Sequence, residues 1–556
     1  MKGTETNIRF GIMVNCNTVE RWQYETIKHL TDNGITLSLV IENAGEPCEY
    51  SSLWDKIRRY PYRIVFFRIW NRYFFRPESK RPADISSLTR NASVIKCRPI
   101  KKGISTYFQQ SDIETIKSYG LDFILRFGFD IVRGDILDCA RHGIWSYHHD
   151  DERVVRGGPP GFWEFMRKTP KNGVILQRLT DKLDKGLIIS RLQFNTILHS
   201  YKQHLDTLLT QSEMMPLQAC MILKSKGTLE PELSTSDAPI LHPPKNIQML
   251  RYLWLCLWRR LVFHLSFLFK QEDWNVGYCL CPIEDFINSD KRDSLDIQWL
   301  KSNIKVGRQE YFADPFVIST ARDTYLFFEW FANKKGKADL AVAKMSEHFN
   351  TLYKIGDFAE HRSFPFVFEH EGVIYCMPEA NKTRKVTLYR FDEDRLSLQH
   401  DSDLLIGDAF VDAALYNQGG QWYLFLTPKQ HSHTHLMIYV ADDMRGPYKP
   451  HPLNPVKIDC RNSRQGGRIF EMNGRIIRPA QNSTEHYGQS IILNEITAIS
   501  EDYYEEKEIM EIKPLRNSKY NKGIHTINGD KHITVFDAKR FTFTIEGFIQ
   551  QLRQRL

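Results

Sequence analysis

Pairs of short strands repeat through the second half of the chain, and this repetition constrains the fold more than any other feature of the sequence. Apolar and β-branched residues fill one couplet at 314–317 and 324–329, and later couplets lie at 364–369 with 373–379, 409–416 with 421–426, 468–471 with 474–478, and 523–528 with 532–536. Turns such as His370-Glu371-Gly372 join their strands. A period of ~50 residues is typical of a propeller or array. We predict about five blades, with 276–279 supplying the missing strand of the last blade.

The first half of the chain has a different pattern. An apolar strand at 8–14, helical apolar spacing over 20–33 and a second strand at 35–41 form a βαβ opening. Further strands are expected at 123–127, 143–147 and 174–179, and a short helix at 135–141. Because no Gly-x-Gly-x-x-Gly follows the first strand, a nicotinamide cofactor is not implied. We predict an open α/β sheet followed by an all-β propeller.

Polar residues gather where two of these strands end. Ser146, His148 and His149 close the 143–147 strand, and Asp184 lies in the turn after 174–179. Open α/β sheets build their sites at the carboxyl ends of strands. A carboxylate on a neighbouring strand end keeps an imidazolium charged and oriented for proton transfer. We therefore predict that His148 and Asp184 form a catalytic pair.

Simpler interpretations of this region stay open. His148-His149-Asp150-Asp151 equally fits a polar strand end. A metal site built from these four residues is disfavoured, because adjacent residues on a strand point in opposite directions and zinc sites use wider spacings. The glycine-rich run 156–161 lacks the Gly-Lys-Ser/Thr ending of a phosphate loop, so we interpret it as a rigid turn near the substrate entrance. No metal is expected.

Three motifs resemble the folate-dependent formyltransferases, which include glycinamide ribonucleotide, methionyl-tRNA and sugar-nucleotide N-formyltransferases. They are Ser146-Tyr147-His148, Arg156-Gly157-Gly158 and the Thr180-Asp181-x-Leu183-Asp184-x-Gly186 segment, and the resemblance runs from about Ile8 to Gln193. It implies that His148 stabilises the oxyanion while Asp184 keeps it protonated and accepts the amine proton through a water. It also implies that backbone groups cradle the pterin of 10-formyltetrahydrofolate, namely those of Phe129, Asp130, Ile131, Val132, Thr180, Asp181 and the residues up to Asp184.

Ser146 is the departure from this family. It stands where the family has an asparagine that donates to the formyl oxygen, and losing an oxyanion donor typically costs about 3–4 kcal/mol. His149 and Tyr147 are candidates to compensate, although strand alternation points Tyr147 to the other face.

The second half resembles the five-bladed propellers of arabinanase-type glycosidases and, more closely, the propeller at the amino end of plant glucosamine inositolphosphorylceramide transferases. The shared motifs are Ala313-Asp314-Pro315-Phe316, Ser363-Phe364-Pro365-Phe366 and Met377-Pro378-Glu379. The resemblance implies that Asp314, Glu379, Asp412, Arg464 and His525 converge at the propeller axis. Paired carboxylates suit glycoside chemistry. Each residue equally fits a hydrogen bond at a blade corner, and a glycan-binding module is the preferred interpretation.

A basic apolar segment at 245–270 joins the two halves. Arg251, Arg259, Arg260 and His264 interrupt it, so it lacks the ~20 apolar residues of a membrane span. A helix on an anionic membrane surface and a helix buried between the halves both fit it. A similar segment lies at 56–81. The net charge of +8 comes with no nucleic-acid-binding motif, so we expect no nucleic acid partner.

The ten cysteines include one close pair, Cys279 and Cys281, which alternation places on one strand face without easy bridging. With no signal peptide at the amino end, we expect a reduced cytoplasmic protein, at most peripheral at the inner membrane face. The expected domains are 1–240, a linker helix 241–272, and 273–556.

Two functions of different class follow. The first is an enzyme that transfers a formyl group from 10-formyltetrahydrofolate to an amine on a sugar nucleotide, glycan or glycolipid, which the propeller grips. The alternative is a non-formylating protein whose glycan-binding or glycan-processing site lies in the propeller.

Overall fold

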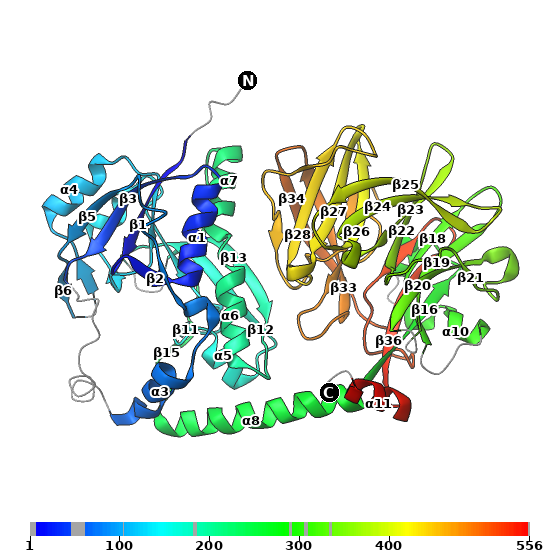
Figure 1. Cartoon of the computed structure of the whole chain (residues 1–556), viewed down its shortest axis with the longest axis horizontal. Coiled ribbons are helices and arrows are strands. Elements are labelled where there is room, and N and C mark those ends of the chain that lie inside the picture. The colour runs from blue at the N-terminus through cyan, green and yellow to red at the C-terminus, as the bar shows by residue number, and fades with distance from the viewer. Residues whose placement is uncertain are drawn as a thin grey trace. The chain divides into compact units, whose positions relative to one another are not determined.

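A computed structural model describes residues 7–45, 62–103, 105–181, 186–288, 292–304, 310–332 and 336–553. Internal contacts divide the chain into two units, residues 1–263 and 264–556 (Figure 1). The first holds an α/β sheet and the second holds antiparallel β-sheets, so the multidomain class expected from the two sequence patterns is confirmed.

The first unit is built on an eight-stranded sheet with the order β14-β13-β12-β10-β8-β1-β3-β5. Neighbours from β5 to β10 pair in parallel, whereas β12, β13 and β14 are antiparallel. The strands are β1 (Arg9–Val14), β3 (Thr36–Asn43), β5 (Ser93–Cys97), β8 (Phe123–Arg126), β10 (Ile144–His148), β12 (Lys171–Arg178), β13 (Leu187–Asn195) and β14 (Glu232–Leu233). The expected strands are therefore present, and the open α/β sheet is confirmed.

Helices accompany this sheet. They are α1 (Arg21–Asp32), α4 (Gln110–Ser118), α5 (Phe162–Arg167), α6 (Tyr201–Gln211) and α7 (Met215–Lys226). The expected helix at 135–141 is a 3₁₀ turn over Asp135–Asp138. Three short pairings complete the unit: β2 (Thr18–Glu20) with β4 (Pro82–Asp84), β6 (Ile100–Lys102) with β7 (Ser105–Tyr107) and β9 (Ile131–Val132), and β11 (Arg156–Gly157) with β15 (Ile240–Leu241).

The central strands are apolar on both faces because helices cover a parallel sheet on both sides. Phe10, Phe123 and Trp145 on neighbouring strands are all fully buried. The Phe123 ring stacks on Phe10 at 5.4 Å and on Trp145 at 3.9 Å. This stacking packs β1, β8 and β10 side by side. The candidate site lies at the carboxyl ends of β8 and β10.

Two segments with aromatic and basic residues lie against the first unit. One runs through η1 (Tyr62–Ile64), α3 (Val65–Ile69) and η2 (Trp70–Phe74), and the other is α8 (Asn246–Phe269). Asn246 joins them by accepting from the Phe66 backbone N–H at 3.0 Å and donating to the Tyr62 carbonyl at 2.9 Å. Among the described residues, α8 and the other helices all fall short of the length and apolar character needed to cross a membrane.

The described residues of the second unit form five antiparallel sheets, the number expected for five blades. They are β18 (Glu310–Ser319), β19 (Thr324–Ala332), β20 (Lys337–Lys344) and β21 (Tyr353–Lys354); β22 (Ser363–His370), β23 (Val373–Glu379), β24 (Lys385–Asp392) and β25 (Ser397–Ile406); β26 (Phe410–Gln418), β27 (Gln421–Pro428), β28 (His435–Ala441), β29 (Lys449–Pro450) and β30 (Lys457–Ile458); β31 (Phe470–Met472), β32 (Arg475–Asn482), β33 (Ser490–Ile499) and β34 (Tyr504–Ile512); and β16 (Gln271–Cys279), β17 (Gln298–Trp299), β35 (Ile527–Gly529) and β36 (Thr534–Thr542).

The last of these sheets joins strands from both ends of the unit. β16 pairs with β36 in antiparallel register from Gln271–Thr542 to Cys279–Thr534. The prediction that 276–279 completes the final sheet is thereby confirmed. Short helices α9 (Ile283–Asn288), α10 (Leu300–Asn303) and α11 (Ile545–Arg553) complete the unit.

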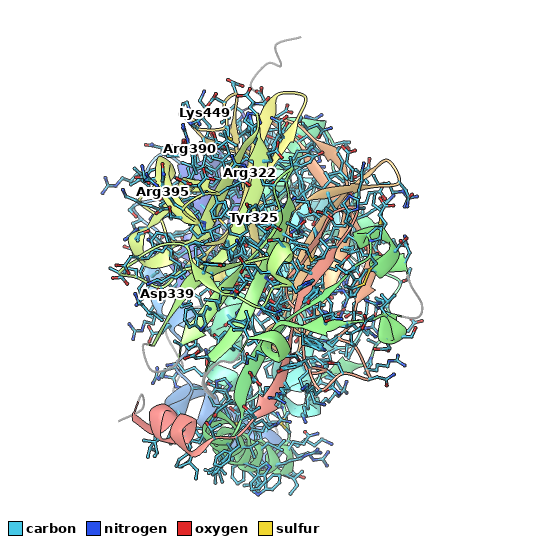
Figure 2. The ribbon with its side chains drawn as sticks, turned by 90° about the vertical axis from the view of Figure 1, so that its right-hand side faces the viewer. Arg322, Tyr325, Asp339, Arg390, Arg395 and Lys449 are labelled. Carbon is cyan, nitrogen blue, oxygen red and sulfur yellow. A yellow bond between two sulfur atoms is a disulfide. The ribbon has the colours of Figure 1, made fainter. Side chains whose placement is uncertain are left out.

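Aromatic packing, more than surface charge, holds the first two of these sheets together. The Tyr325 ring of β19 packs edge-on against Phe391 of β24 at 5.5 Å, and Figure 2 labels Tyr325 beside Arg322. Arg322 forms a 2.8 Å ion pair with Asp394, but both side chains are mostly exposed. Exposed ion pairs contribute about 0–1 kcal/mol, so the buried rings dominate this contact.

Three first strands of the second unit share one local distortion. Asp314, Phe364 and Asp412 have φ of 50°, 44° and 49°, and the register shifts at the same points in β18, β22 and β26. A β-bulge with a left-handed residue re-aims a side chain and is rare outside glycine. The same bulge therefore occurs in the first strand of three of the five sheets, within the repeated couplets seen in the sequence.

The cysteine prediction is wrong at one point. Cys279 and Cys281 form a disulfide with their Cα atoms 5.5 Å apart. The expectation assumed a continuous strand, but β16 ends at Cys279 and the chain bends over Leu280 and Cys281. That bend brings the two sulfur atoms together.

Candidate functional site

A cavity of about 580 Å³ lies in the first unit at the carboxyl ends of β8 and β10. This volume falls within the range of small-molecule sites. Basic and polar side chains supply much of its wall. The lining residues are Lys101, Gly103, Ser105, Thr106, Arg126, Asp130, Ile131, Val132, Arg133, Tyr147, His148, Gln177, Leu179, Thr180 and Gly186.

Arg126, the last residue of β8, holds a central place in this cavity. Its Nε and Nη2 donate to the Ser146 hydroxyl at 3.2 and 2.8 Å, and its Nη1 donates to the Asp130 carbonyl. Burial lowers the pKa of Arg126, and the nearby Asp130 carboxylate opposes that effect. Its Nη1 also donates to the Gly128 carbonyl at 3.5 Å, so the protein engages Nε and Nη1 fully and leaves the second N–H of Nη2 as donor capacity beside the cavity.

Ser146 has a different surrounding from the one the sequence implied. Its side chain is 1% exposed and does not line the cavity. The hydroxyl accepts from Arg126 and lies 3.4 Å from the Tyr147 carbonyl, to which it donates. With its single proton engaged by that carbonyl, Ser146 orients Arg126 instead of facing a ligand.

His148 does line the cavity, at the last position of β10. Its Nε2 lies 3.9 Å from the Asp150 Oδ2, with 19% of the imidazole side chain exposed. Asp184, the predicted partner, lies outside the described residues. Among the described residues, the carboxylate that lies beside His148 is therefore that of Asp150.

Asp150 itself belongs to a buried pair of carboxyl groups. Its Oδ1 accepts from the Gly161 N–H at 2.7 Å. Burial, reinforced by Glu164, raises the pKa of Asp150 well above its ordinary value, and burial raises the pKa of Glu164 to about 7. Because two carboxyls in one buried site cannot both ionise cheaply, this pair shares a proton at neutral pH.

The two residues expected to compensate for Ser146 point elsewhere. The Tyr147 hydroxyl donates to the Ser212 carbonyl at 3.0 Å, although part of its side chain lines the cavity. His149 is buried, lies 3.3 Å from the Ser212 hydroxyl and stacks on Tyr147 at 5.3 Å. Burial lowers the pKa of His149 to about 3, so it is neutral. The Tyr147 hydroxyl and the His149 imidazole are thus both engaged with Ser212.

The predicted pterin-binding residues fall into two groups. Asp130, Ile131, Val132 and Thr180 line the cavity. Phe129 is buried with φ of 67° and donates its N–H to Asn15 at 3.2 Å, whereas the Asp181 carboxylate accepts from the Gly134 N–H at 3.0 Å. The last two shape the loops that carry the lining residues.

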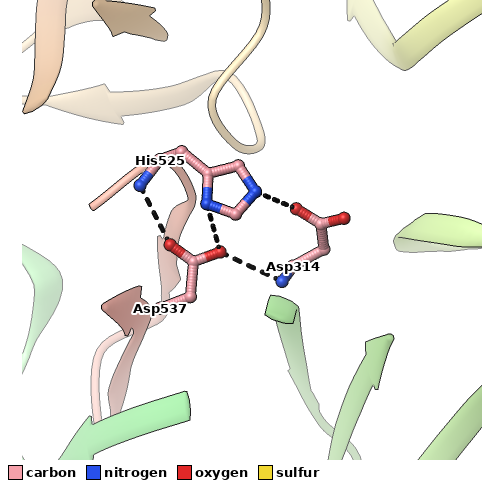
Figure 3. A group of neighbouring side chains, drawn as sticks. All are labelled: Asp314, His525 and Asp537. Atoms are coloured by element: carbon pink, nitrogen blue, oxygen red, sulfur yellow. Dashed lines mark hydrogen bonds and ion pairs between the residues drawn. The ribbon is translucent and has the colours of Figure 1, made fainter. Parts of the chain in front are cut away.

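A second cluster lies in the second unit, where Asp314, His525 and Asp537 meet (Figure 3). The His525 Nε2 lies 2.9 Å from Asp314 and its Nδ1 lies 2.8 Å from Asp537. Burial opposes the charged imidazole, but the two carboxylates raise the pKa of His525 to about 10. Burial likewise opposes the Asp314 anion, yet His525 lowers the pKa of Asp314 to about 2. The three side chains form a charged clamp.

These same atoms have the chemistry of a metal site. One ligand atom from each of Asp314, His525 and Asp537 lies within 4.8 Å of the others, and this is the group of that kind found among the described residues. A metal ion here would have to displace the proton of His525. Asp537 is further engaged by the backbone N–H groups of Asp314, His525 and Thr526, which favours the clamp.

Glu379, Asp412 and Arg464 form the neighbouring part of the cluster. Arg464 donates through Nη2 to Asp412 at 3.2 Å, and Gln481 donates to Asp412 at 2.6 Å. Burial and then the adjacent Asp412 raise the pKa of Glu379 to about 8. Tyr487 joins the two parts, since its ring lies 5.2 Å from the Arg464 guanidinium and 5.1 Å from the His525 ring. All five residues predicted for the axis therefore gather in one cluster.

Sequence reasoning missed three members of these sites. Arg126 ends an otherwise apolar strand, and an arginine at that position was the available signal. Glu329 and Asp537 lie on the second strands of their sheets, where no motif marked them. Burial and Asp314 raise the pKa of Glu329 well above its ordinary value, so it carries a proton beside the clamp.

Comparison with known proteins finds a family match for one part of the chain. Residues 301–545 match a family model described as glucosamine inositolphosphorylceramide transferase 1, N-terminal. The Arabidopsis thaliana protein of that name is 31% identical over 245 residues, which are 42% of this chain and 31% of the relative. The chain therefore spans less than a third of the length of these curated relatives.

Solved structures resemble each half only weakly. Glycinamide ribonucleotide transformylase 1 from Symbiobacterium toebii covers 41% of this chain and 94% of its own, with 13% identity and a TM-score of 0.29. A thermostable family-43 glycoside hydrolase covers 38% of this chain and 78% of its own, with 15% identity and a TM-score of 0.29. Similarity at this level carries no functional argument.

Proposed function

We propose that the first unit transfers a formyl group from 10-formyltetrahydrofolate to an amine on a sugar nucleotide, glycan or glycolipid. The observation that supports this most directly is the cavity at the ends of β8 and β10, which brings His148 and the Arg126 guanidinium to one wall. Its volume of about 580 Å³ and its mixed polar and apolar lining suit a flat heteroaromatic ligand with polar edges. When bound, the folate supplies the activated formyl group.

Arg126 is the oxyanion donor in this proposal. An amine that attacks a formyl carbon builds negative charge on the formyl oxygen, and a preorganised cationic donor in a partly buried wall stabilises that charge. Ser146 acts as a positioning residue, because its hydroxyl accepts two N–H groups of the same guanidinium. The serine that replaces asparagine and the arginine that ends β8 then serve one purpose together.

His148 carries the proton chemistry. The imidazole at the cavity wall accepts the proton that the amine loses and is held from the far side by Asp150, 3.9 Å away. Because Asp150 and Glu164 share a proton, the charge on the Asp150 carboxyl beside the imidazole can change during the reaction. Asp184 stays a proposed participant on the strength of the family motif.

Calorimetry of the full chain with 5-formyltetrahydrofolate, an unreactive isomer of the donor, tests this proposal. We expect saturable binding with Kd on the order of micromolar. Arg126→Met is expected to weaken binding at least about tenfold, the loss of one charge-assisted hydrogen bond. Arg141→Met, an exposed arginine of the same unit, is the matched control and should bind as wild type. Absence of binding at millimolar concentration would sink folate-dependent transfer.

The acceptor is proposed to be an amino sugar on a glycolipid or nucleotide, held by the second unit. The relatives of residues 301–545 are named for glucosamine and inositolphosphorylceramide, an amino sugar and a lipid with a polar head. We further propose that the five sheets are blades of a propeller whose axis is the cluster around Asp412 and His525. Ordered carboxylates, an arginine and aromatic rings are the groups that bind sugars.

A second candidate function places the chemistry in that cluster. Glu379, whose pKa is raised to about 8 by burial and Asp412, lies beside the Asp412 carboxylate that accepts from Arg464. Such a pair offers an acid and a base for glycan processing. In that case Glu379→Gln should abolish release of reducing sugar from a cell-envelope glycan panel, and Glu369→Gln, at an exposed glutamate of β22, is the control.

A further inference from the structure

Two amphipathic segments of the first unit present apolar side chains outward. On α8, large apolar residues remain exposed at positions that share a helix face, including Leu250 (51%), Trp254 (60%), Leu257 (73%) and Leu261 (48%). Their spacing of four, three and four residues keeps them on one stripe. Met249 and Tyr252, on the opposite stripe, are buried against the unit.

The segment 62–75 repeats this arrangement. Tyr62, Phe66, Ile69 and Tyr73 follow the same four-three-four spacing and are 45–74% exposed, whereas Phe67 and Trp70 pack inward with Met249 and Tyr252. Asn246 ties this segment to the start of α8 through two hydrogen bonds. The two outward stripes are therefore parts of one surface, which we call the basic apolar face.

The charges on this face have one sign. Neither 62–77 nor 245–270 contains an aspartate or a glutamate. Arg251 and Arg260 of α8 are exposed, and at about 100° per residue they fall on opposite sides of the apolar stripe. Arg63 and Arg72 are exposed on the other segment. Apolar residues flanked by arginines are the pattern of a helix that lies in a membrane interface.

A groove of about 490 Å³ adjoins this face, since Trp254 also lines it. Trp258 and Phe263 of α8 line it as well, together with Lys168 and His199. The Phe263 ring stacks on His199 at 3.9 Å, which holds the groove wall in place. Aromatic rings and a lysine around one groove match the interface between acyl chains and anionic head groups.

We propose that the basic apolar face binds the surface of an anionic lipid bilayer. Soluble proteins rarely leave a contiguous apolar patch of more than a few hundred Å² uncovered, so an occupant is expected. A second copy of the chain would bring arginines against arginines, whereas anionic lipid neutralises them. The helix is not long and apolar enough to span, so the contact is interfacial. This inference does not depend on formyl transfer.

Vesicle co-sedimentation of the full chain tests this surface, with phosphatidylcholine vesicles and vesicles that also contain phosphatidylglycerol. Wild type is expected to bind the anionic vesicles at least about tenfold more tightly, and added salt should weaken that binding. Trp254→Glu with Leu257→Glu should lose at least about tenfold in affinity. Ile406→Glu with Leu233→Glu, where the native residues are 70% and 60% exposed elsewhere, is the matched control and should bind as wild type.

A second pair of variants separates charge from apolar insertion. Arg251→Gln with Arg260→Gln should weaken binding to anionic vesicles about fivefold for each arginine and leave phosphatidylcholine binding unchanged. Equal vesicle binding by wild type and by Trp254→Glu with Leu257→Glu would overturn the proposal. An absence of vesicle binding by wild type would also overturn it. That holds even if light scattering showed a dimer that these substitutions dissociate.

Discussion

His525→Gln offers a sharp test of the charged clamp in the second unit. The substitution removes a buried cation that contacts Asp314 at 2.9 Å and Asp537 at 2.8 Å. Relative to the ordinary value of 6.5, a pKa of about 10 for His525 corresponds to about 5 kcal/mol, at 1.36 kcal/mol per pH unit. The pKa of about 2 for Asp314 corresponds to about 2 kcal/mol.

The two values are not added, because they describe the same contact from its two sides. The histidine value is larger because His525 faces two carboxylates, whereas the pairing of Asp314 is with the single His525 imidazole. Removing one partner of a buried ion pair costs about 3–5 kcal/mol. We therefore expect His525→Gln to lower the free energy of unfolding by about 3–5 kcal/mol at pH 6.

The pH dependence has a definite sign. Because the folded-state pKa of His525 is raised, its stabilisation is fully present below pH 6.5 and is lost as the pH rises toward 10. The stability gap between wild type and His525→Gln should shrink over that window. Urea unfolding of the full chain followed by tryptophan fluorescence measures the gap, and Trp274 lies 4.3 Å from the His525 ring.

His435→Gln is the control for this experiment. Burial lowers the pKa of His435 well below its ordinary value, so this histidine is neutral in the folded chain above pH 7. Its stability gap should stay constant between pH 7 and pH 10. A constant gap for His525→Gln as well would refute the imidazolium assignment, and a neutral His525 between two carboxylates would then fit a metal ligand set.

Two further substitutions test contacts within each unit. Glu506 accepts from Arg478 and Lys457, each at 2.7 Å; burial opposes its charge, but these cations lower its pKa to about 2. The stabilisation by the Glu506 carboxylate is therefore present above pH 4.5 and is lost as the pH falls toward 2. Glu506→Gln should lower the free energy of unfolding in urea by about 3–5 kcal/mol at pH 7. The control Glu505→Gln, at an exposed residue, should lower it by less than about 0.5 kcal/mol. Gly157→Ala should cost about 2 kcal/mol or more in thermal unfolding, because φ is +103° and a Cβ would lie 2.1 Å from the Leu241 carbonyl oxygen. Gly227→Ala, where φ is +75° and a Cβ meets nothing within 4 Å, should cost about 1 kcal/mol, and equal costs at the two glycines would show that the β11–β15 contact is not tight.

The sequence predicted the strands of the first unit closely. The run at 123–127 became β8 (Phe123–Arg126), and 143–147 became β10 (Ile144–His148), because continuous apolar residues between turns are a local signal of a buried parallel strand. The sequence also predicted His148 at a strand end, and His148 is the last residue of β10 and lines the cavity. The partner residue Asp184 lies outside the described residues and stays a prediction.

The function of Ser146 could not be seen in the same way. The hydrogen bond of Ser146 depends on Arg126, which is 20 residues away in the chain. Arg126 reaches Ser146 only because β8 and β10 are neighbours in the sheet. An amide replaced by a hydroxyl looks like a loss when each residue is considered alone. In the folded unit the hydroxyl accepts from a guanidinium that lines the cavity.

By itself, then, the sequence determined the elements: strand periodicity, the repeated couplets and the residues that close each strand are properties of short windows. Only the tertiary structure decided which residues from distant parts of the chain contact one another. Asp314 and Asp537 are 223 residues apart and meet at His525 because their sheets meet, and the bend after Cys279 decided the disulfide. Contacts across such distances depend on the register and packing of several strands at once, and no local pattern contains that information.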